Sequence, residues 1–339
     1  MKISFLVTYY NQERYVRESL DSILATDKPE EWEILVGDDG STDHTVDIVR
    51  EYMAKDPEHI FLFIMPREQG VRYHPVRRAS ANRLNLLSHC TGDCFCTLDG
   101  DDFYCDRSFV KEAIDIFHKR QDVSLVSFGY KLFSEGVITK EETLPIQGGT
   151  IIHTEEYIRS FYLHSGAGVH RILWDQDRLQ YIRNIGYFDD NDIVMNTLKY
   201  GKMYFINQSV YVYRQTGESV FTGMKQLEQA VLNVLGYDVD KQLIDDQYQN
   251  ALTIRNTQPI LQMYNQRNQL RTSLGEELFS IYQDICRGLK DSLADKLLNY
   301  HDLEEKEKKD IRKLVYWLKI RNMKVTVRMR GQRILRGNE

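Results

Sequence analysis

Residues 94–106 read CFCTLDGDDFYCD, in which an apolar run ends at three carboxylates, Asp99, Asp101 and Asp102, set around Gly100. Acidic groups beside a buried strand are costly unless a cation or hydrogen-bond donors take up their charge. The hard ions Mg²⁺ and Mn²⁺ prefer oxygen ligands and often bind through one or two carboxylates, water and a substrate phosphate. The stretch therefore indicates a metal site for a phosphate-bearing ligand, with a solvated acidic turn as the alternative.

Two earlier stretches also end an apolar run in polar residues. Residues 34–36 are apolar and precede Asp38 and Asp39, after which apolar residues recur at helical spacing. Residues 3–7 likewise precede a polar turn at 11–13 and a second helical pattern. Three strand-to-helix units thus place polar groups at strand carboxyl ends, where open α/β sheets bind ligands.

Three ordered motifs resemble the nucleotide-sugar domain of family 2 glycosyltransferases, which have the GT-A fold. They are FLVTYYNQERYVRESLDSIL at 5–24, DDGSTD at 38–43 and LDGDDFY at 98–104. Asn82, Arg83 and the TGD at 91–93 also resemble the lead into the DXD motif of that family. Because the order and the spacing agree, the resemblance is much more specific than any one motif, and it remains an analogy of fold and site.

The resemblance implies a fold and a domain organisation. We expect an α/β chain with a Rossmann-like GT-A domain, a mixed central sheet and a C-terminal helical region. The catalytic domain would cover 1–224, with a nucleotide-binding half at 1–120 and an acceptor half at 121–224. Residues 225–339 contain many Leu, Gln, Lys and Glu residues and are expected to form the helical region, which ends in a basic tail.

The family pattern assigns most of the polar residues to the nucleotide. Carboxylates accept hydrogen bonds from the imide N–H of uracil and from ribose hydroxyls. The residues expected to bind the nucleotide are Tyr10, Glu13, Asp38, Asp39, Arg83, Asp99 and Arg214. For Arg83, an ordinary surface arginine is the alternative.

The resemblance makes Asp99 and Asp101 the DXD pair. Asp101 is expected to contact Mn²⁺ or Mg²⁺ directly, and Asp99 to contact the ribose or to reach the metal through water. Such a metal stabilises the negative charge that grows on a leaving diphosphate. Asp102 is expected near the donor or acceptor, unless it orients its neighbours or caps the helix after Asp106.

An inverting transfer also needs a base that takes the proton from the acceptor hydroxyl. In the family this base comes from a later acidic motif, and the best match is FDDNDIVMNTLKYGKMYFI at 188–206. Asp192 is the expected base and Asp190 the alternative. The competing interpretation is that these acids only favour the N-terminal dipole of the helix that follows.

The chain departs from the family in the stretch SVYVYRQTGES. A His that often follows the Tyr-Arg pair there, and helps to hold the metal or the diphosphate, is replaced by Thr216, which puts a third protein contact in doubt. Tyr213 and Arg214 remain candidates for the diphosphate, because Arg offers a bidentate fork to phosphate. His170 and Arg171 are expected near the donor sugar or the acceptor, with a structural His as the alternative.

Composition is that of a globular enzyme, with 42% hydrophobic and 28% charged residues. No apolar stretch has the length needed to span a bilayer and the amino end lacks a signal-peptide pattern, which together predict a cytoplasmic location. The cluster of Cys90, Cys94 and Cys96 suggests zinc, but no CxxC pair or matching His pattern accompanies it. Small buried thiols are therefore favoured.

Residues 306–339 carry 12 Lys or Arg against three acidic residues, so the two ends of the chain differ in charge. The apolar and aromatic residues between these cations resemble an interfacial segment that lies on anionic lipid, at the inner face of a cell membrane. An RNA-binding tail, an oligomer contact and a helix docked on the acidic domain are the alternatives. No nucleic-acid-binding motif supports nucleic acid as the main partner.

These observations predict a metal-dependent, inverting glycosyltransferase. The resemblance implies a nucleoside-diphosphate sugar, with UDP, as donor and a glycan or lipid-linked acceptor in the synthesis of a bacterial surface polysaccharide or glycoconjugate. The alternative is a catalytically weak scaffold subunit that binds a sugar nucleotide within a glycan-assembly complex, and a homo-oligomer is compatible with either. A nucleotidyltransferase is disfavoured, because a glycine-rich phosphate loop is missing near the first strand.

Overall fold

The structure, a computed structural model, describes residues 1–71, 73, 75–216, 236–237, 239–253, 255–256, 305 and 309. The chain divides into two compact units, of which the first comprises Met1–Lys225 and Leu235–Gln249. The second comprises Gln226–Val234 and Asn250–Glu339. Every element below belongs to the first unit. The basic tail expected at 306–339 lies outside the described residues, apart from Lys309.

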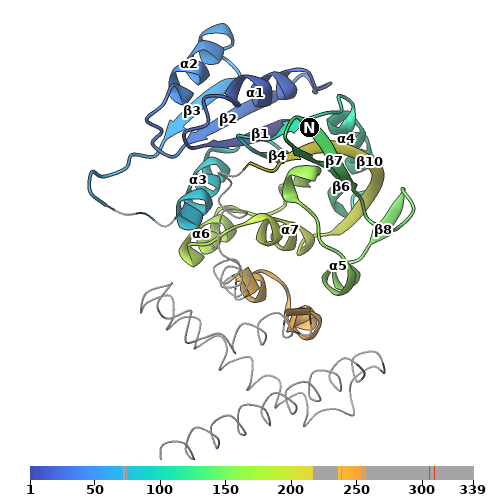
Figure 1. Cartoon of the computed structure of the whole chain (residues 1–339). Helices are drawn as coiled ribbons and strands as arrows, with labels where there is room; N and C mark the ends of the chain where they lie inside the picture. Colours follow the sequence, from blue (N-terminus) through green and yellow to red (C-terminus); the bar gives the residue numbers. More distant parts are fainter. Residues whose placement is uncertain are drawn as a thin grey trace, which may run out of the picture. The chain divides into compact units, whose positions relative to one another are not determined.

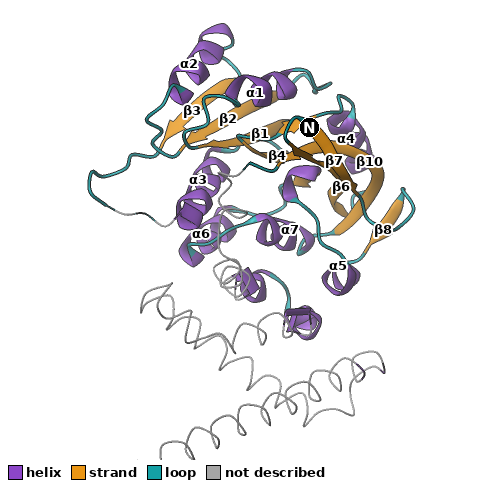
Figure 2. Cartoon of the chain, in the orientation of Figure 1, coloured by secondary structure: helices purple, strands orange, loops and turns teal. Residues whose placement is uncertain are grey.

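A ten-stranded mixed sheet forms the centre of the first unit (Figures 1 and 2). Its order is β3-β2-β1-β4-β9-β6-β10-β5, with β7 paired to β6 and β8 paired to β10. The strands are β1 (Ile3–Tyr9), β2 (Trp32–Asp38), β3 (Ile60–Ile64), β4 (Cys94–Asp99), β5 (Phe103–Tyr104), β6 (Val123–Ser134), β7 (Val137–Glu142), β8 (Thr150–Ile152), β9 (Gly168–Arg171) and β10 (Lys202–Arg214). The predicted α/β fold with a mixed central sheet is confirmed.

Helices cover both faces of the sheet, and Figure 1 shows α1 and α2 on one side with α3, α6 and α7 on the other. Apolar residues at helical spacing drive this packing; α1, for example, buries Val16, Leu20 and Ile23. The helices are α1 (Val16–Leu24), α2 (Thr45–Lys55), α3 (Pro75–His89), α4 (Phe109–Lys119), α5 (Thr154–Ser160), α6 (Gln176–Ile185) and α7 (Asp190–Leu198), with 3-10 turns η1 (Ser165–Ala167) and η2 (Asp246–Tyr248). Within the described ranges, no helix has the length and apolar character to cross a membrane.

Parallel pairing brings the ends of β1, β2 and β4 to one edge of the sheet. Tyr9 is the register partner of Asp38, and Thr8 is the partner of Asp99. The strands themselves are buried apolar runs, as expected for parallel strands covered on both faces. The polar residues that follow them therefore gather at this edge, as the sequence predicts.

Strand β9 runs antiparallel to both of its neighbours, β4 and β6. Its first residue, and not its last, therefore lies toward the edge that carries the acidic residues. Its last residue, Arg171, pairs with Cys94 at the start of β4. Its first residue, Gly168, pairs with Ser127 on β6. The edge that carries the acidic residues is therefore approached by η1, which precedes β9, and not by the end of β9.

Candidate active site

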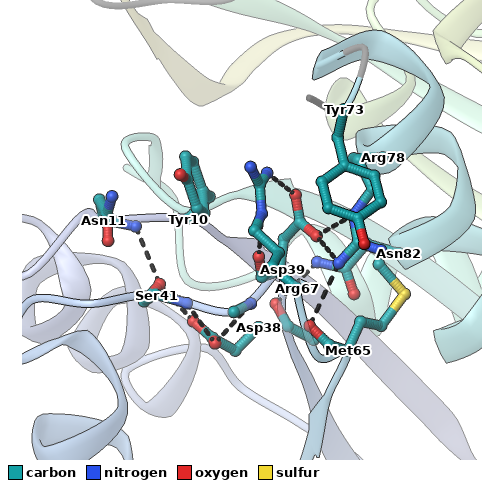
Figure 3. Close-up of polar contacts among 12 residues, drawn as sticks. Tyr10, Asn11, Asp38, Asp39, Ser41, Met65, Arg67, Tyr73, Arg78 and Asn82 are labelled. Atoms are coloured by element: carbon teal, nitrogen blue, oxygen red, sulfur yellow. Dashed lines mark hydrogen bonds and ion pairs between the residues drawn. The ribbon is translucent and has the colours of Figure 1, made fainter. Parts of the chain in front are cut away.

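Asp39, directly after β2, is held by two arginines (Figure 3). Arg67 donates from Nε to the main-chain oxygen of Asp39 at 2.7 Å and from Nη2 to its Oδ2 at 2.5 Å. Arg78 donates from Nε to Oδ1 at 2.5 Å. Since Asp39 is only 4% exposed, these cations balance a buried charge. A nucleoside that hydrogen-bonds to this carboxylate would share it with the two arginines or displace one of them.

Two tyrosines flank these arginines, as Figure 3 shows. The Arg67 guanidinium lies 3.8 Å from the ring centre of Tyr10, which is 43% exposed. The Arg78 guanidinium lies 4.7 Å from the ring centre of Tyr73. Such stacking holds a flat cationic group against an aromatic face. Sequence reasoning missed Arg67, Tyr73 and Arg78, and the signal for them is a cluster of arginines in the loop after β3 and in the first turn of α3.

The Asp38 carboxylate holds the turn after β2, and its expected contact with the nucleotide stays a prediction. Its Oδ1 accepts hydrogen bonds from the backbone N–H groups of Gly40 at 3.0 Å and Ser41 at 2.9 Å, and its Oδ2 accepts from the Ser41 hydroxyl. Both oxygens are thus committed to the turn after β2, where Gly40 has a φ of 74°. Glu13 accepts from the backbone N–H of His44 at 2.9 Å and so joins the loop after β1 to the start of α2.

Asp99 and Asp101 lie at the end of β4 and in the loop that follows. Asp99 accepts from Nη2 of Arg83 at 3.0 and 3.2 Å and from the Thr8 hydroxyl at 3.2 Å. Asp101 accepts from the Thr216 hydroxyl at a long 3.5 Å. Burial, together with the charge of Asp99, raises the pKa of Asp101 to about 6. A cation would relieve both effects.

This donor set fits a hard divalent cation bound together with phosphate. Among the described residues, no group of three or more His, Cys, Asp or Glu side chains could hold a metal ion. Mg²⁺ and Mn²⁺ do not require one, because one or two carboxylates suffice when water and phosphate complete the shell. Asp101 and Asp99 would hold the ion. At the position where the family pattern has a histidine imidazole, this chain has the hydroxyl of Thr216.

The acidic loop is joined to β10 at two points. Asp102 bonds to Tyr211 and Arg214 of β10, and the Arg214 side chain bonds to Asp101. Asp102 is 1% exposed and accepts from the Tyr211 hydroxyl and, at 2.7 Å, from the backbone N–H of Arg214. Burial and the charge of Asp101 raise the pKa of Asp102 well above its usual value. Arg214 donates from Nε to the main-chain oxygen of Asp101 at 2.7 Å and from Nη2 to Glu18. Asp102 is thus buried against β10, and Arg214 is bound to Asp101 and Glu18, while their expected contacts with the donor, the acceptor and the diphosphate stay predictions.

The turn at the start of α7 carries three acids, and the structure separates their roles. Asp192 is 1% exposed, and its Oδ2 accepts from the backbone N–H of Asp189 at 2.7 Å, which completes a capping box. Asp190 instead accepts from the Ser165 hydroxyl, which also lies 3.0 Å from the Thr97 hydroxyl on β4. The geometry therefore disfavours Asp192 as the base, because it is committed to the helix, and favours Asp190.

Asp190 is held in its ionised form. Burial alone would raise its pKa, but His164, Arg83 and hydrogen bonds from Ser165 bring the pKa of Asp190 below its usual value. Arg83 also donates from Nη1 to Asp189 at 3.1 Å. An ionised carboxylate beside an acidic loop is able to accept a proton from a hydroxyl placed next to it.

His170 and Arg171 lie away from this edge, contrary to expectation. His170 is 0% exposed and sits between the Thr197 hydroxyl and the main-chain oxygen of Ser165, each 3.1 Å away. Burial lowers the pKa of His170 to about 4. Arg171 donates to the main-chain oxygen of Phe117 at 2.9 Å. The antiparallel course of β9 explains both positions.

The residues just before β9 reach the site instead. The ring of His164 lies 4.8 Å from that of Tyr211 and 5.2 Å from that of Tyr213, and the expected contact of Tyr213 with the diphosphate stays a prediction. A Cβ on Gly166 would lie 2.5 Å from the Tyr211 ring, so this packing requires glycine. Sequence reasoning missed His164 and Ser165, although the glycine-spaced SGAGV indicated a tight segment.

The structure is an α/β fold with a mixed central sheet and with acidic residues at the ends of neighbouring parallel strands, the arrangement expected of a GT-A domain. The sequence profile of Glycosyl transferase family 2 matches residues 4–176. The chain belongs to this family.

Two curated relatives illustrate the range of similarity. EpsE of Bacillus subtilis (strain 168) is 31% identical over 144 residues, which are 42% of this chain and 48% of EpsE. Poly(ribitol-phosphate) beta-N-acetylglucosaminyltransferase TarS of Staphylococcus aureus (strain MW2) is 46% identical over 56 residues, which are 16% of this chain and 10% of TarS. The chain spans about half the length of the first curated relatives that it matches.

Two solved structures share the fold. Residues 1–349 of S. aureus TarS, in complex with UDP-GlcNAc, match with a TM-score of 0.57 and 17% identity over 92% of this chain and 90% of that chain. The mannosyltransferase PcManGT from Pyrobaculum calidifontis, in complex with GDP-Man and Mn²⁺, matches with a TM-score of 0.51 and 14% identity over 93% and 84%. At these identities the likeness establishes the architecture.

Proposed function

We propose that this chain transfers a glycosyl group, with inversion, from a UDP-sugar to a hydroxyl of a glycan or lipid-linked acceptor in the assembly of a bacterial surface polysaccharide or glycoconjugate. The observation that carries the proposal is the position of Arg83. It joins Asp99, at the end of β4, to Asp189, at the start of α7. The carboxylates expected on the donor side therefore stand next to Asp190, the carboxylate expected on the acceptor side.

The nucleoside would bind at Asp39. A carboxylate oxygen accepts from the imide N–H of uracil, and Tyr10 offers an exposed ring for stacking. Arg67 would move aside, because it now lies on the Tyr10 ring and on Asp39. UDP-GlcNAc in a solved TarS complex supports a uridine donor, whereas GDP-Man in PcManGT makes guanosine the comparison to test.

The chemistry assigned to the protein itself is proton removal. Asp190 would take the proton of the acceptor hydroxyl as the new C–O bond forms and the bond to the diphosphate breaks, and Ser165 and Arg83 keep that carboxylate oriented and ionised. Mn²⁺ or Mg²⁺, when bound by Asp101 and Asp99, supplies stabilisation of the charge on the diphosphate.

The test is a thermal-shift and hydrolysis screen of sugar nucleotides. UDP with Mn²⁺ or Mg²⁺ should stabilise the protein much more than UDP with EDTA, because the acidic loop accepts phosphate only through a cation. GDP serves as the matched nucleotide control. Equal stabilisation in EDTA would remove the metal from the proposal, and larger stabilisation by GDP would change the donor.

The nucleoside assignment has its own variant. Asp39→Ala should weaken UDP binding even in EDTA, because it removes a contact to the base and not to the metal. Arg17→Ala, which removes an exposed partner of Glu51, is the control and should leave UDP affinity unchanged. Unchanged affinity for Asp39→Ala would mean that the base lies elsewhere.

A scaffold subunit that binds a sugar nucleotide without efficient transfer is the second candidate. The observation that favours it is Thr216, whose hydroxyl stands 3.5 Å from Asp101 where the family pattern has an imidazole. A scaffold would bind UDP in a metal-dependent way and release no sugar in the hydrolysis screen. If the wild type turns over the sugar nucleotide and Asp190→Asn does not, the scaffold candidate is excluded.

We further propose a cytoplasmic enzyme that contacts anionic lipid through its basic tail, and a homo-oligomer remains compatible with this arrangement. The support is the charge of residues 306–339, which lie almost wholly outside the described residues. Vesicles with anionic lipid should co-sediment with the protein at low salt and lose it at high salt, because the attraction is screened. Equal binding to neutral vesicles would contradict this, and light scattering measures the oligomeric state.

A further inference from the structure

Strand β3 lies at one margin of the sheet (Figure 1) and, among the described strands, pairs with β2 alone. Its five residues, IFLFI at 60–64, are all apolar. Phe61 is 37% exposed and Ile64 is 45% exposed. The unpaired N–H and C=O groups of such an edge are a template for pairing with another strand, and proteins normally protect them.

The other strands that have a single neighbour among those described are each protected. β5 has two residues and β8 has three, so both are too short to serve as templates. β7 has six residues and ends in Lys140, Glu141 and Glu142. Short length and charged side chains are common protections against edge pairing. β3 has neither, which indicates that another strand covers its outer side.

The bonds to β2 decide which main-chain groups of β3 face outward. The N–H of Ile34 donates to the main-chain oxygen of His59, and the N–H of Met65 donates to that of Asp38, each at 2.8 Å. Along a strand, residues that bond to one neighbour alternate with residues that face away from it. The odd-numbered residues from 59 to 65 therefore bond to β2, and the even-numbered ones between them face outward.

The outward groups have a symmetric order along the strand. Within the described residues, no hydrogen bond uses the outward N–H or C=O of Leu62 or Ile64. The N–H of Ile60 is taken by the main-chain oxygen of Asp56 at 3.2 Å, and the Ile60 oxygen faces outward. An acceptor at 60, a donor and an acceptor at 62 and a donor at 64 match the same set turned by half a revolution about Leu62.

We propose that β3 pairs antiparallel with β3 of a second copy of this chain, about a two-fold axis at Leu62. Leu62 of each copy donates to the main-chain oxygen of Leu62 in the other copy. Ile64 of each copy donates to the main-chain oxygen of Ile60 in the other. A two-fold axis is the commonest symmetry of homo-oligomers, and it joins the same surface of both subunits. This association does not depend on which reaction the site performs.

The side chains fit the same register. Phe61 lies opposite Phe63 of the second copy on one face of the sheet, and such cross-strand aromatic pairs stabilise antiparallel strands. The Phe63 ring is already stacked on His89, with 4.1 Å between ring centres. Ile64 lies opposite Ile60 on the other face. One pairing therefore covers both exposed apolar side chains of β3 and uses only residues of this chain, which makes a second copy the occupant.

Light scattering and sedimentation of the full chain over a range of concentrations test the proposal. The wild type should show twice the mass of one chain and dissociate on dilution. Ile64→Lys places a charge on the edge and should raise the dimer Kd at least about tenfold. Ile138→Lys is the matched control, because Ile138 is 48% exposed on β7, and it should leave the Kd unchanged.

Disulfide cross-linking tests the register. Residues opposite each other in a hydrogen-bonded antiparallel pair have Cα atoms about 5.5 Å apart, a distance that a disulfide spans. Because position 62 lies opposite itself, Leu62→Cys should give a covalent dimer on oxidation. Phe61→Cys should not, because position 61 lies opposite position 63. The wild type controls for the native cysteines, of which Cys105 is exposed.

A variant that keeps the strand apolar guards against misfolding of Ile64→Lys. Leu62→Pro removes an outward N–H and no bond to β2, a substitution that edge strands tolerate, and it should also raise the dimer Kd about tenfold or more. A monomeric wild type, an unchanged Kd in the folded edge variants, or equal weakening by Ile138→Lys would overturn the proposal. Cross-linking through Phe61→Cys and not through Leu62→Cys would overturn it as well.

Discussion

Arg83 and Asp99 are joined by two hydrogen bonds, 3.0 and 3.2 Å from the same guanidinium nitrogen, while the other terminal nitrogen of Arg83 reaches Asp189 at 3.1 Å. The Arg83 side chain is 13% exposed, whereas those of Asp99 and Asp189 are 32% and 35% exposed, so solvent screens these ion pairs in part. One arginine therefore sets the distance between the strand end that carries the acidic loop and the turn that carries Asp190.

Replacement of Arg83 should separate these two elements. Arg83→Ala leaves Asp99 and Asp189 as uncompensated carboxylates and should lower the free energy of unfolding by roughly 3 kcal/mol, as for other broken buried ion pairs. Arg83→Lys keeps the charge but not the two-pronged guanidinium. It should therefore lower the free energy of unfolding less than Arg83→Ala does and still reduce turnover. Arg17→Ala, which breaks the exposed pair with Glu51, is the control and should change stability by less than about 1 kcal/mol.

Removal of the proposed base should affect the rate and not donor binding. Asp190→Asn should retain UDP affinity within a few-fold and lose about 10² to 10⁴ in turnover of the sugar nucleotide identified by the screen. Asp192→Asn is the comparison, and its main effect should appear in stability and its pH dependence, because Asp192 is buried in the capping box. A larger rate loss for Asp192→Asn than for Asp190→Asn would return the base to Asp192.

Metal binding at the acidic loop should weaken in acid. Without a cation the pKa of Asp101 is about 6, so protons compete with the metal below that pH. The apparent Kd for Mn²⁺ in the presence of UDP, measured by calorimetry, should be nearly constant from pH 8 to 7 and rise severalfold from pH 6 to 5. Asp101→Ala should abolish metal-dependent UDP binding at every pH. A Kd that is flat down to pH 5 would place the metal on other groups.

His170 should contribute a destabilisation in acid. Its folded-state pKa of about 4 lies below the usual histidine value of 6.5, so the unfolded chain binds the extra proton first. Stability should be complete above pH 6.5 and fall as the pH drops toward 4, by roughly 3 kcal/mol if the whole shift is realised. In His170→Gln this part of the pH dependence of chemical denaturation should disappear. An unchanged acid slope would mean that His170 is not buried in its neutral form.

Much of the fold and part of the candidate site follow from the sequence alone. The apolar runs before Asp38 and Asp99, each followed by a glycine and a helical pattern, predict strand, turn and helix because these signals are local. Parallel pairing then brings the strand ends to one edge, and this explains why Asp39, Asp99 and Asp101 were recognised together. Family membership rests on the same ordered motifs.

Tertiary structure decided which of several similar residues reaches that edge. Asp190 and Asp192 are two residues apart on one helix, so their side chains leave it about 200° apart, and only packing shows which one is buried. His170 lies in the core because β9 runs antiparallel, while His164 and Ser165 take the position at the edge. The partners of Asp39 come from two other segments, Arg67 from the loop after β3 and Arg78 from α3. Sequence spacing specifies neighbours along the chain, whereas burial and ion pairing depend on which distant segments are brought together.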